Sequence, residues 1–297
     1  VNRDRASKLA AVNILYRVGA RNENPARTGF AHLFEHLMFR GTRAVENFDL
    51  PVQMASGDNN AFTNNDYTDF YITLPKDNLE TALWLESDRM EGLDITPAKL
   101  EAEKKVVIEE FRQRYLNQPY GDQTMLLRAL AYKVHPYRWA AIGLATDHIA
   151  GATLADVESF YRAHYRPSNA ILSISADMEE ERMLELAEKW FAPLADHPSA
   201  TSAIPQEPVQ TQARRQEVER DVPASTVTVA YHMCARTKPD FYTADLVSDL
   251  LSGGDSGRLY THLVKERNLL SSVNAYITGD VDPGLFVFTG QLLPGVT

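Results

Sequence analysis

The hydrophobic and polar positions show a pattern typical of strands in some segments of the chain and a pattern typical of helices in others. Apolar residues that alternate with polar ones, or run together over a few positions, indicate strands, whereas apolar residues every three or four positions indicate helices. The predicted strands span residues 9–18, 59–63, 67–74, 169–175, 226–234, 273–278 and 285–291. The predicted helices span residues 31–41, 48–55, 78–90, 96–111, 122–131, 153–164, 179–191, 241–251 and 256–267. This mixture of strands and helices indicates an α+β fold.

The order of these elements occurs twice. A strand, two helices and a strand pair begin at residue 9 and again at residue 226. The sequence His-Leu-Phe-Glu-His-Leu-Met at 32–38 aligns with Asp-Leu-Val-Ser-Asp-Leu-Leu at 245–251, and every apolar position matches. We therefore expect an internal duplication that gives two homologous α/β sandwich domains, each an antiparallel-rich sheet covered by helices. The alternative is a chance similarity between two amphipathic helices.

A segment rich in Pro, Ser, Ala and Thr separates the two copies and is typical of a linker. We expect a first domain at 1–195, a linker at 196–213 and a second domain at 214–297. The chain starts with Val1 and stops after a strand, without a closing helix. We therefore expect a fragment trimmed at both ends, with a truncated second domain. The compartment, bacterial cytoplasm or periplasm, is left open because a signal peptide would be missing.

The composition narrows the class of protein. The chain has 297 residues, 44% of them hydrophobic and 24% charged, which are the proportions of an ordinary globular protein. A formal net charge of −10 argues against nucleic acid or an anionic membrane as a partner. No run of 18 apolar residues is present, so no membrane span is expected. The single cysteine, Cys234, excludes an internal disulfide, and we expect it to be buried in a strand.

The predicted helix at 31–41 carries the strongest chemical signal. His32, Glu35 and His36 fall on one narrow arc of this helix, and the remaining positions as far as Phe39 are apolar. Burying two imidazoles and a carboxylate together is costly unless a partner compensates them, and a metal ion does so. The spacing H-x-x-E-H is a known zinc signature, with His32 and His36 as ligands and Glu35 as a base. The alternative is a solvent-facing helix with ordinary surface residues.

A third ligand is expected from the long helix at 96–111. Its buried arc is defined by four apolar residues, Leu100, Val106, Val107 and Phe111. Glu103 and Glu110, two turns apart, fall within this arc, whereas Glu109 points to the opposite side. A buried cation explains carboxylates in an apolar stripe. We therefore predict Glu110 as the third zinc ligand and Glu103 as a residue that orients a ligand or water, with a structural ion pair as the alternative for Glu103.

Three protein ligands leave zinc an open position for water, which is typical of a catalytic site. Glu35 would accept a proton from that water and later return it to the leaving amine. The chemistry indicated is therefore Zn2+-dependent peptide hydrolysis by an endopeptidase.

The chain carries the set His32, Glu35, His36 and Glu110. With this set, it resembles the M16 family of zinc metallopeptidases, which includes pitrilysin, insulin-degrading enzyme and the mitochondrial processing peptidase. The family pattern is H-x-x-E-H followed roughly 75 residues later by a Glu ligand, and here Glu110 lies 74 residues after His36 (110 − 36 = 74). The family's auxiliary Glu, seven residues before the ligand, matches Glu103. The resemblance is strongest to the bacterial subfamily with two homologous domains and to the processing peptidase beta subunit.

The resemblance also implies that the substrates are peptides or unfolded segments, and it implies where they bind. The stretch from Gly57 to Thr63 is similar to the family's edge strand beside the metal, where Asn60, Ala61 and Phe62 would bind the substrate. An extended peptide would add a strand there, so that main-chain hydrogen bonds supply affinity.

One departure from the family pattern concerns the non-metal half. That half often supplies an Arg, with a Tyr seven residues later, to hold the substrate carbonyl, but here Lys265 and Ser272 occupy those points. We therefore expect a homologous partner subunit that supplies Arg and Tyr, or a homodimer. The alternative function is a non-catalytic M16-like core or scaffold subunit of a larger assembly.

Overall fold

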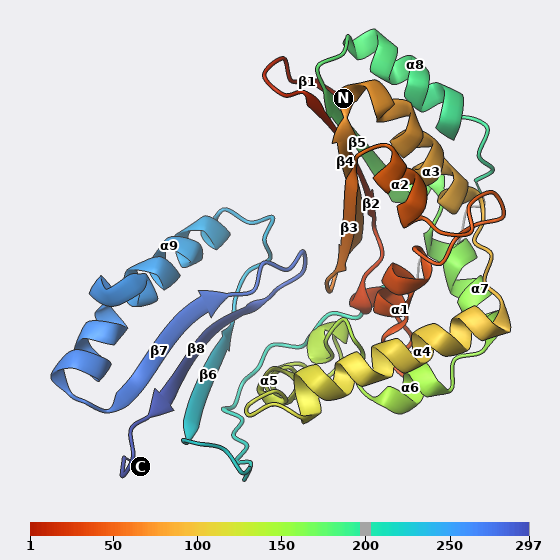
Figure 1. The fold of residues 1–297 in the computed structure, drawn as a ribbon. Helices are drawn as coiled ribbons and strands as arrows, with labels where there is room; N and C mark the ends of the chain where they lie inside the picture. Colours follow the sequence, from red (N-terminus) through yellow and green to blue (C-terminus); the bar gives the residue numbers. More distant parts are fainter. Residues whose placement is uncertain (197–202, 297) are drawn as a thin grey trace. The chain divides into compact units, whose positions relative to one another are not determined.

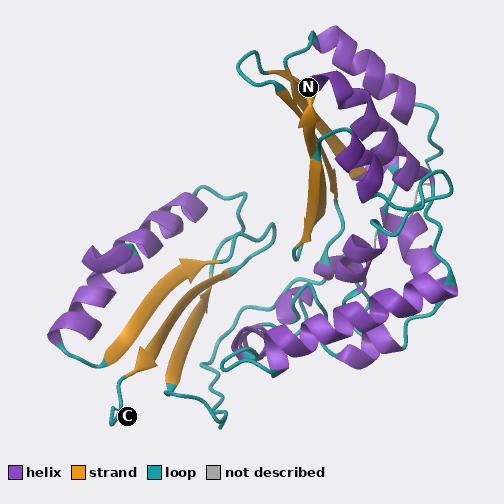
Figure 2. Cartoon of the chain, in the orientation of Figure 1, coloured by secondary structure: helices purple, strands orange, loops and turns teal. Residues whose placement is uncertain are grey.

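The computed structural model describes residues 1–196 and 203–296. The chain divides into two compact units, one formed by Val1–Gln113 with Val134–Gln206 and the other by Arg114–Lys133 with Glu207–Thr297. Each unit combines a sheet with helices (Figures 1 and 2), so the predicted α+β class is confirmed. Residues 197–202 of the predicted linker lie outside the described part of the chain.

The first unit contains a five-stranded sheet with the order β1-β5-β2-β4-β3. Its strands are β1 (Asn2–Arg3), β2 (Leu9–Tyr16), β3 (Asp58–Thr63), β4 (Thr68–Pro75) and β5 (Ala170–Ala176). Only β1 and β5 pair in parallel; the other neighbours are antiparallel. The hairpin of β3 and β4 turns at Asn64-Asn65-Asp66, as predicted, and leaves β3 at the edge of the sheet.

The helices of the first unit are α1 (Phe30–Leu37), α2 (Asp49–Met54), α3 (Leu79–Glu91), α4 (Pro97–Phe111), α6 (Thr146–Ala150), α7 (Leu154–His164) and α8 (Glu180–Phe191). α2, α3 and α8 form a layer on one face of the sheet (Figure 1). The core between sheet and helices is built from alternate strand residues, such as Val12 and Ile72, and from Leu83 and Met183 on the helices. In β4 this is the alternation, through Ile72 and Leu74, that predicted the strand, whereas β2 was indicated by its apolar character.

The second unit has a three-stranded antiparallel sheet with the order β6-β8-β7. Its elements are α5 (Gln123–Ala131), β6 (Thr226–His232), α9 (Asp240–Ser252), β7 (Leu270–Ile277) and β8 (Leu285–Leu292). α9 packs on β7, where the Ser252 hydroxyl donates to the carbonyl of Ala275 at 2.8 Å. Short 3-10 and π-helical turns occupy Ala20–Asn22, Lys76–Asn78, Arg112–Leu116, Pro136–Arg138, Pro167–Asn169, Gly254–Ser256 and Tyr260–Glu266.

The two units differ from the predicted domains at residues 114–133, which the sequence pattern assigns to the first domain. The reason is a set of hydrogen bonds within the second unit. The Tyr120 hydroxyl donates to the carbonyl of Ala224 at 2.8 Å, and Arg214 donates to the carbonyl of Ala131 at 2.7 Å. Such long-range contacts leave no periodic signal in the sequence.

Three local predictions need correction. The helix predicted at 31–41 ends at Leu37, and the following residues form a turn. Val106, assigned to the buried arc of α4, is 43% exposed, because the buried side of the helix runs through Leu100 and Val107 instead. Cys234 lies two residues beyond β6 and is only half-buried, since the strand ends at His232.

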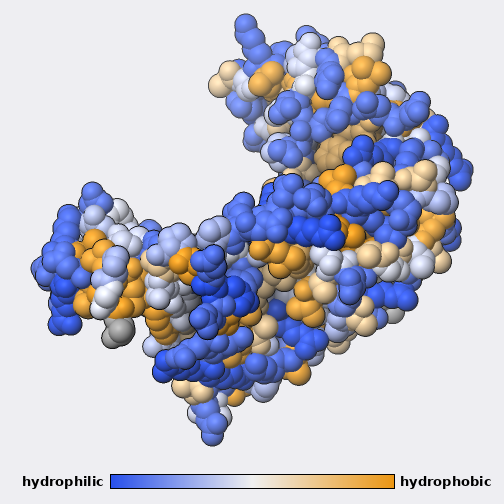
Figure 3. Space-filling view, turned by 60° about the horizontal axis from the view of Figure 1, so that its bottom comes forward, coloured by the Kyte–Doolittle hydropathy of each residue, from blue (hydrophilic) through white to orange (hydrophobic). Residues whose placement is uncertain are grey.

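Among the described residues, no helix is both long enough and apolar enough to cross a lipid bilayer. The face in Figure 3 mixes hydrophilic and hydrophobic side chains, with hydrophilic ones widespread.

A pH dependence of stability arises at the end of α7. Burial, aided by the nearby charge of Arg166, lowers the pKa of His164 from 6.5 to about 4. Because the unfolded chain binds this proton more readily, His164 should reduce stability as the pH falls from about 6.5 to about 4, by at most about 1.4 kcal/mol per pH unit. We expect His164→Gln to remove this contribution to the pH dependence of the free energy of unfolding, measured by urea denaturation at several pH values. The same pH dependence of the free energy of unfolding in the unchanged chain and in the variant would contradict this expectation.

Candidate metal centre

The helix that carries the predicted metal ligands begins at a backbone position suited to glycine. Gly29, the N-cap of α1, has φ 91°, and a Cβ there would lie 2.6 Å from the carbonyl oxygen of Ile142. Along α1 the residues Ala31, Leu33, Phe34 and Leu37 are buried. The side chains of His32, Glu35 and His36 are 11%, 18% and 23% exposed, so they share the one side of the helix that is not fully buried.

The second contributing helix, α4, starts as the sequence indicates. The Thr96 hydroxyl accepts a hydrogen bond from the backbone N–H of Lys99 at 3.2 Å, and proline occupies the first helical position. Two turns separate Glu103 and Glu110 along this helix. Their side chains are 1% and 20% exposed, so both carboxylates lie on its inner side.

The two helices bring the predicted ligand set together. Nε2 of His32 lies 3.2 Å, and Nε2 of His36 lies 3.4 Å, from the same oxygen of Glu110. One donor atom from each of the three residues lies within 4.8 Å of the others. Donors in a tetrahedral zinc site, with bonds of about 2.05 Å, lie about 3.3 Å apart. The donor set of two imidazoles and a carboxylate therefore fits zinc in both chemistry and spacing.

Glu35 lies beside this group and is not one of its three members. Its Oε2 is 3.3 Å from Nδ1 of His32. Burial acts to raise the pKa of Glu35, but contacts with His32 and Thr63 outweigh burial, so the pKa is lowered. A carboxylate that is ionised at neutral pH is the state that a general base requires.

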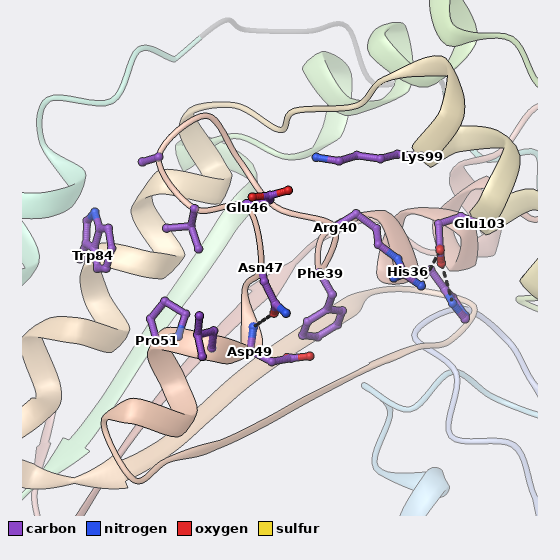
Figure 4. A pocket seen from close by; sticks show the side chains of 13 residues that line it. His36, Phe39, Arg40, Glu46, Asn47, Asp49, Pro51, Trp84, Lys99 and Glu103 are labelled. Atoms are coloured by element: carbon purple, nitrogen blue, oxygen red, sulfur yellow. Dashed lines mark hydrogen bonds and ion pairs between the residues drawn. The ribbon is translucent and has the colours of Figure 1, made fainter.

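Glu103 touches two partners (Figure 4). Its carboxylate lies 3.4 Å from Nδ1 of His36 and 2.6 Å from Nη2 of Arg40. Burial opposes ionisation, but His36 and Arg40 together lower the pKa of Glu103. The contact with His36 is the one that a ligand-orienting role needs, and the contact with Arg40 is the ion pair of the alternative interpretation. Both contacts are therefore present at Glu103.

The pKa values of both histidines are raised. Burial lowers the pKa of His36, but Glu103 and Glu110 outweigh burial and raise it to about 9. Burial likewise lowers the pKa of His32, and contacts with Glu110 and Glu35 give a net increase. The carboxylates thus create a site that favours positive charge, which a divalent cation would satisfy.

A cavity of about 870 Å³ lies next to His36 and Glu103 (Figure 4). Apolar side chains, among them Phe39, Leu50 and Trp84, line part of it, and Lys99 and Asp49 contribute charge. The cavity is lined entirely by residues of the first unit.

The predicted substrate-binding residues lie on the edge strand β3. Asn60, Ala61 and Phe62 pair with β4 on one side, and β3 has no neighbouring strand on its other side within the sheet. Phe62 is 44% exposed. β3 also packs close to α1, so the open edge lies near the helix that carries the histidines.

The departures from the family pattern lie in the second unit. Lys265 belongs to the turn Tyr260–Glu266, where its Nζ donates to the carbonyl of Asp255 at 3.0 Å. Ser272 lies in β7.

Two residues near the candidate centre, Arg40 and Glu23, were not predicted from the sequence. Arg40 follows His36 by four positions, a spacing that would have indicated the same side of a continuing helix. Glu23 lies on a loop, and no periodic pattern marks it, yet its carboxylate contacts the first turn of α1.

Comparisons with known proteins identify the family of the chain. Residues 1–140 match the family described as Insulinase (Peptidase family M16), and residues 151–296 match the Peptidase M16 inactive domain. The chain belongs to the M16 peptidase family.

The similar proteins include the zinc protease PqqE of Helicobacter pylori, 33% identical over 290 residues, which cover 96% of this chain and 65% of that protein. A probable mitochondrial-processing peptidase subunit beta of Arabidopsis thaliana is 24% identical over 95% of this chain and 55% of its own. The crystal structure of a protease from Helicobacter pylori superposes with a TM-score of 0.92 at 32% identity, covering 98% of this chain and 71% of that one. The chain thus spans 55–65% of the length of these two curated relatives.

Proposed function

We propose that the chain is the metal-bearing part of a zinc-dependent endopeptidase that hydrolyses peptides or unfolded segments. The observation that carries the proposal is the convergence of His32, His36 and Glu110 within 4.8 Å, with Glu35 beside them. Relatives named zinc proteases support zinc as the metal.

His32, His36 and Glu110 would hold the zinc ion. A zinc ion held there would act as a Lewis acid and would lower the pKa of a water molecule to about 7. Glu35 would accept a proton from that water and would later donate it to the amine of the departing peptide. Glu103 contacts Nδ1 of His36 and so fixes the orientation of this imidazole.

The substrate would bind in an extended conformation along β3. Its backbone would add a strand beside Asn60, Ala61 and Phe62, where the sheet has an open edge. Main-chain hydrogen bonds tolerate many sequences, so this mode suits peptides of varied composition. The cavity beside His36 is large enough to receive a substrate side chain.

The proposal is tested by metal content and by cleavage. The purified chain should contain about one zinc per chain by mass spectrometry. Cleavage of unstructured peptides, measured with the partner subunit present, should stop on addition of a chelator and return with zinc. A chain that binds no zinc would instead favour a non-catalytic scaffold subunit. The inactive-domain description of residues 151–296 is the observation that favours that second candidate.

We further propose that activity requires a homologous subunit. Lys265 and Ser272 stand where the family often has the Arg and Tyr that hold the substrate carbonyl, and stabilisation of the developing oxyanion is a large part of catalysis. The purified chain alone should therefore bind zinc yet cleave peptides poorly, and a homologous subunit with Arg and Tyr should restore cleavage. Full activity of the isolated full-length chain would refute this requirement, and activity that rises with self-association would indicate a homodimer.

A further inference from the structure

A buried carboxylate outside the ligand set contacts the helix that carries the histidines. Glu23 is only 5% exposed. Its Oε1 accepts a hydrogen bond from the backbone N–H of Ala31 at 2.9 Å, and its Oε2 accepts one from the N–H of Gly29 at 2.9 Å. Both amides belong to the start of α1, and Ala31 directly precedes His32.

The start of α1 needs such an external partner. The first amides of a helix have no acceptor within the helix, and a side chain at the N-cap ordinarily supplies one. Here the N-cap is Gly29, which has no side chain to offer. Glu23 replaces the missing cap from six residues upstream by accepting hydrogen bonds from both amides.

A third N–H donor, that of Trp139, also contacts the Glu23 carboxyl group. Nε1 of the buried Trp139 lies 3.1 Å from Oε2 of Glu23 and 3.1 Å from the carbonyl oxygen of Ala20, and can donate to both. Glu23 therefore joins the first turn of α1 to two other segments, the turn at Ala20 and the segment around Trp139. Three N–H donors on one carboxylate leave it little freedom to move.

A neutral cap would hold the amides at a smaller desolvation cost. Burial raises the pKa of Glu23 to about 8, although the N–H groups of Ala31, Gly29 and Trp139 oppose the shift. The Glu23 carboxyl therefore accepts the N–H groups of α1 in a place where burial opposes its charge.

We propose that Glu23 is a positioning residue for the metal centre. By fixing the first turn of α1, it sets the place at which His32 presents Nε2 to Glu110. The inference rests on the proposed metal site and adds to it a residue that does not itself touch the metal.

The test uses cobalt(II) and zinc with the full chain in four forms: unchanged, Glu23→Gln, Glu23→Asp and Met183→Ala. Glutamine presents an N–H2 group to one of the three donors, whereas aspartate keeps the carboxyl group but shortens its reach. Met183 is a buried core residue on α8, which packs on α3, so its truncation destabilises the fold away from α1. Metal affinity is measured by competition with a chelator, site geometry by the visible spectrum of bound cobalt, and stability by the Tm of the metal-free protein.

We expect Glu23→Gln to weaken zinc binding about tenfold and to change the cobalt spectrum, in the range found for residues that orient metal ligands. Glu23→Asp should lie between this variant and the unchanged chain. Met183→Ala should lower the Tm of the metal-free protein and leave both metal readouts unchanged. These readouts separate positioning from general destabilisation.

Unchanged affinity and spectrum in both Glu23 variants would overturn the proposal while the metal site stands. If Glu23→Gln does not fold, Glu23→Asp decides the matter by the same readouts. A chain that binds no metal even when unchanged would instead refute the proposed function, so the two failures are distinguishable.

Discussion

Glu35→Gln is expected to keep zinc bound and to lower the rate of peptide hydrolysis by at least about a hundredfold, the contribution of a positioned general base. Glutamine has nearly the shape of glutamate but cannot accept the proton. Glu35 stands 3.3 Å from His32 without belonging to the group of three donors, so its loss should not remove the metal. Zinc content by mass spectrometry and initial rates on an unstructured peptide, with the partner subunit present, measure the two effects separately.

The zinc content of Glu35→Gln is the internal control for this variant. Near-normal rates would show that another group accepts the proton and that the base assignment is wrong. Loss of zinc together with activity would instead place Glu35 among the ligands.

His36→Ala and Glu110→Gln are expected to lose zinc and, with it, all measurable hydrolysis. Each removes one of three donors, and a site with two protein ligands holds zinc far more weakly. Glu109→Gln is the matched control, because Glu109 precedes Glu110 on α4 but its side chain is 53% exposed and pairs with Arg112. It should retain both metal and activity.

Zinc content after dialysis against a weak chelator distinguishes these variants from the control. If Glu110→Gln and Glu109→Gln kept equal amounts of zinc, Glu110 would not be the third ligand. That result would remove the geometric basis of the proposed hydrolase.

The geometry of the candidate metal centre is predictable because its parts follow helical spacing. His32, Glu35 and His36 share one side of α1, and the seven-residue step from Glu103 to Glu110 keeps both on the inner side of α4. The helical repeat of α1 or of α4 does not by itself indicate that the two helices converge. It was inferred from the need of buried charges for a common partner and from the resemblance to a known family.

Other features left no such signal. Glu23 contacts α1 from an irregular loop, and the position of its carboxylate depends on Trp139, more than a hundred residues later. Residues 114–133 contain a well-predicted helix, but their grouping with the second unit depends on hydrogen bonds to Ala224 and Arg214. Local periodicity predicts elements and faces, whereas long-range polar contacts require the folded chain.

The open edge of β3 carries a risk as well as a use. A strand with unpaired N–H and C=O groups can recruit a second copy of itself as readily as a substrate, which leads to aggregation. β3 is short, and its first three residues are Asp58, Asn59 and Asn60, which are among the types least favoured in strands. This polar start would discourage self-association, so the sequence of the edge reflects colloidal stability as well as recognition.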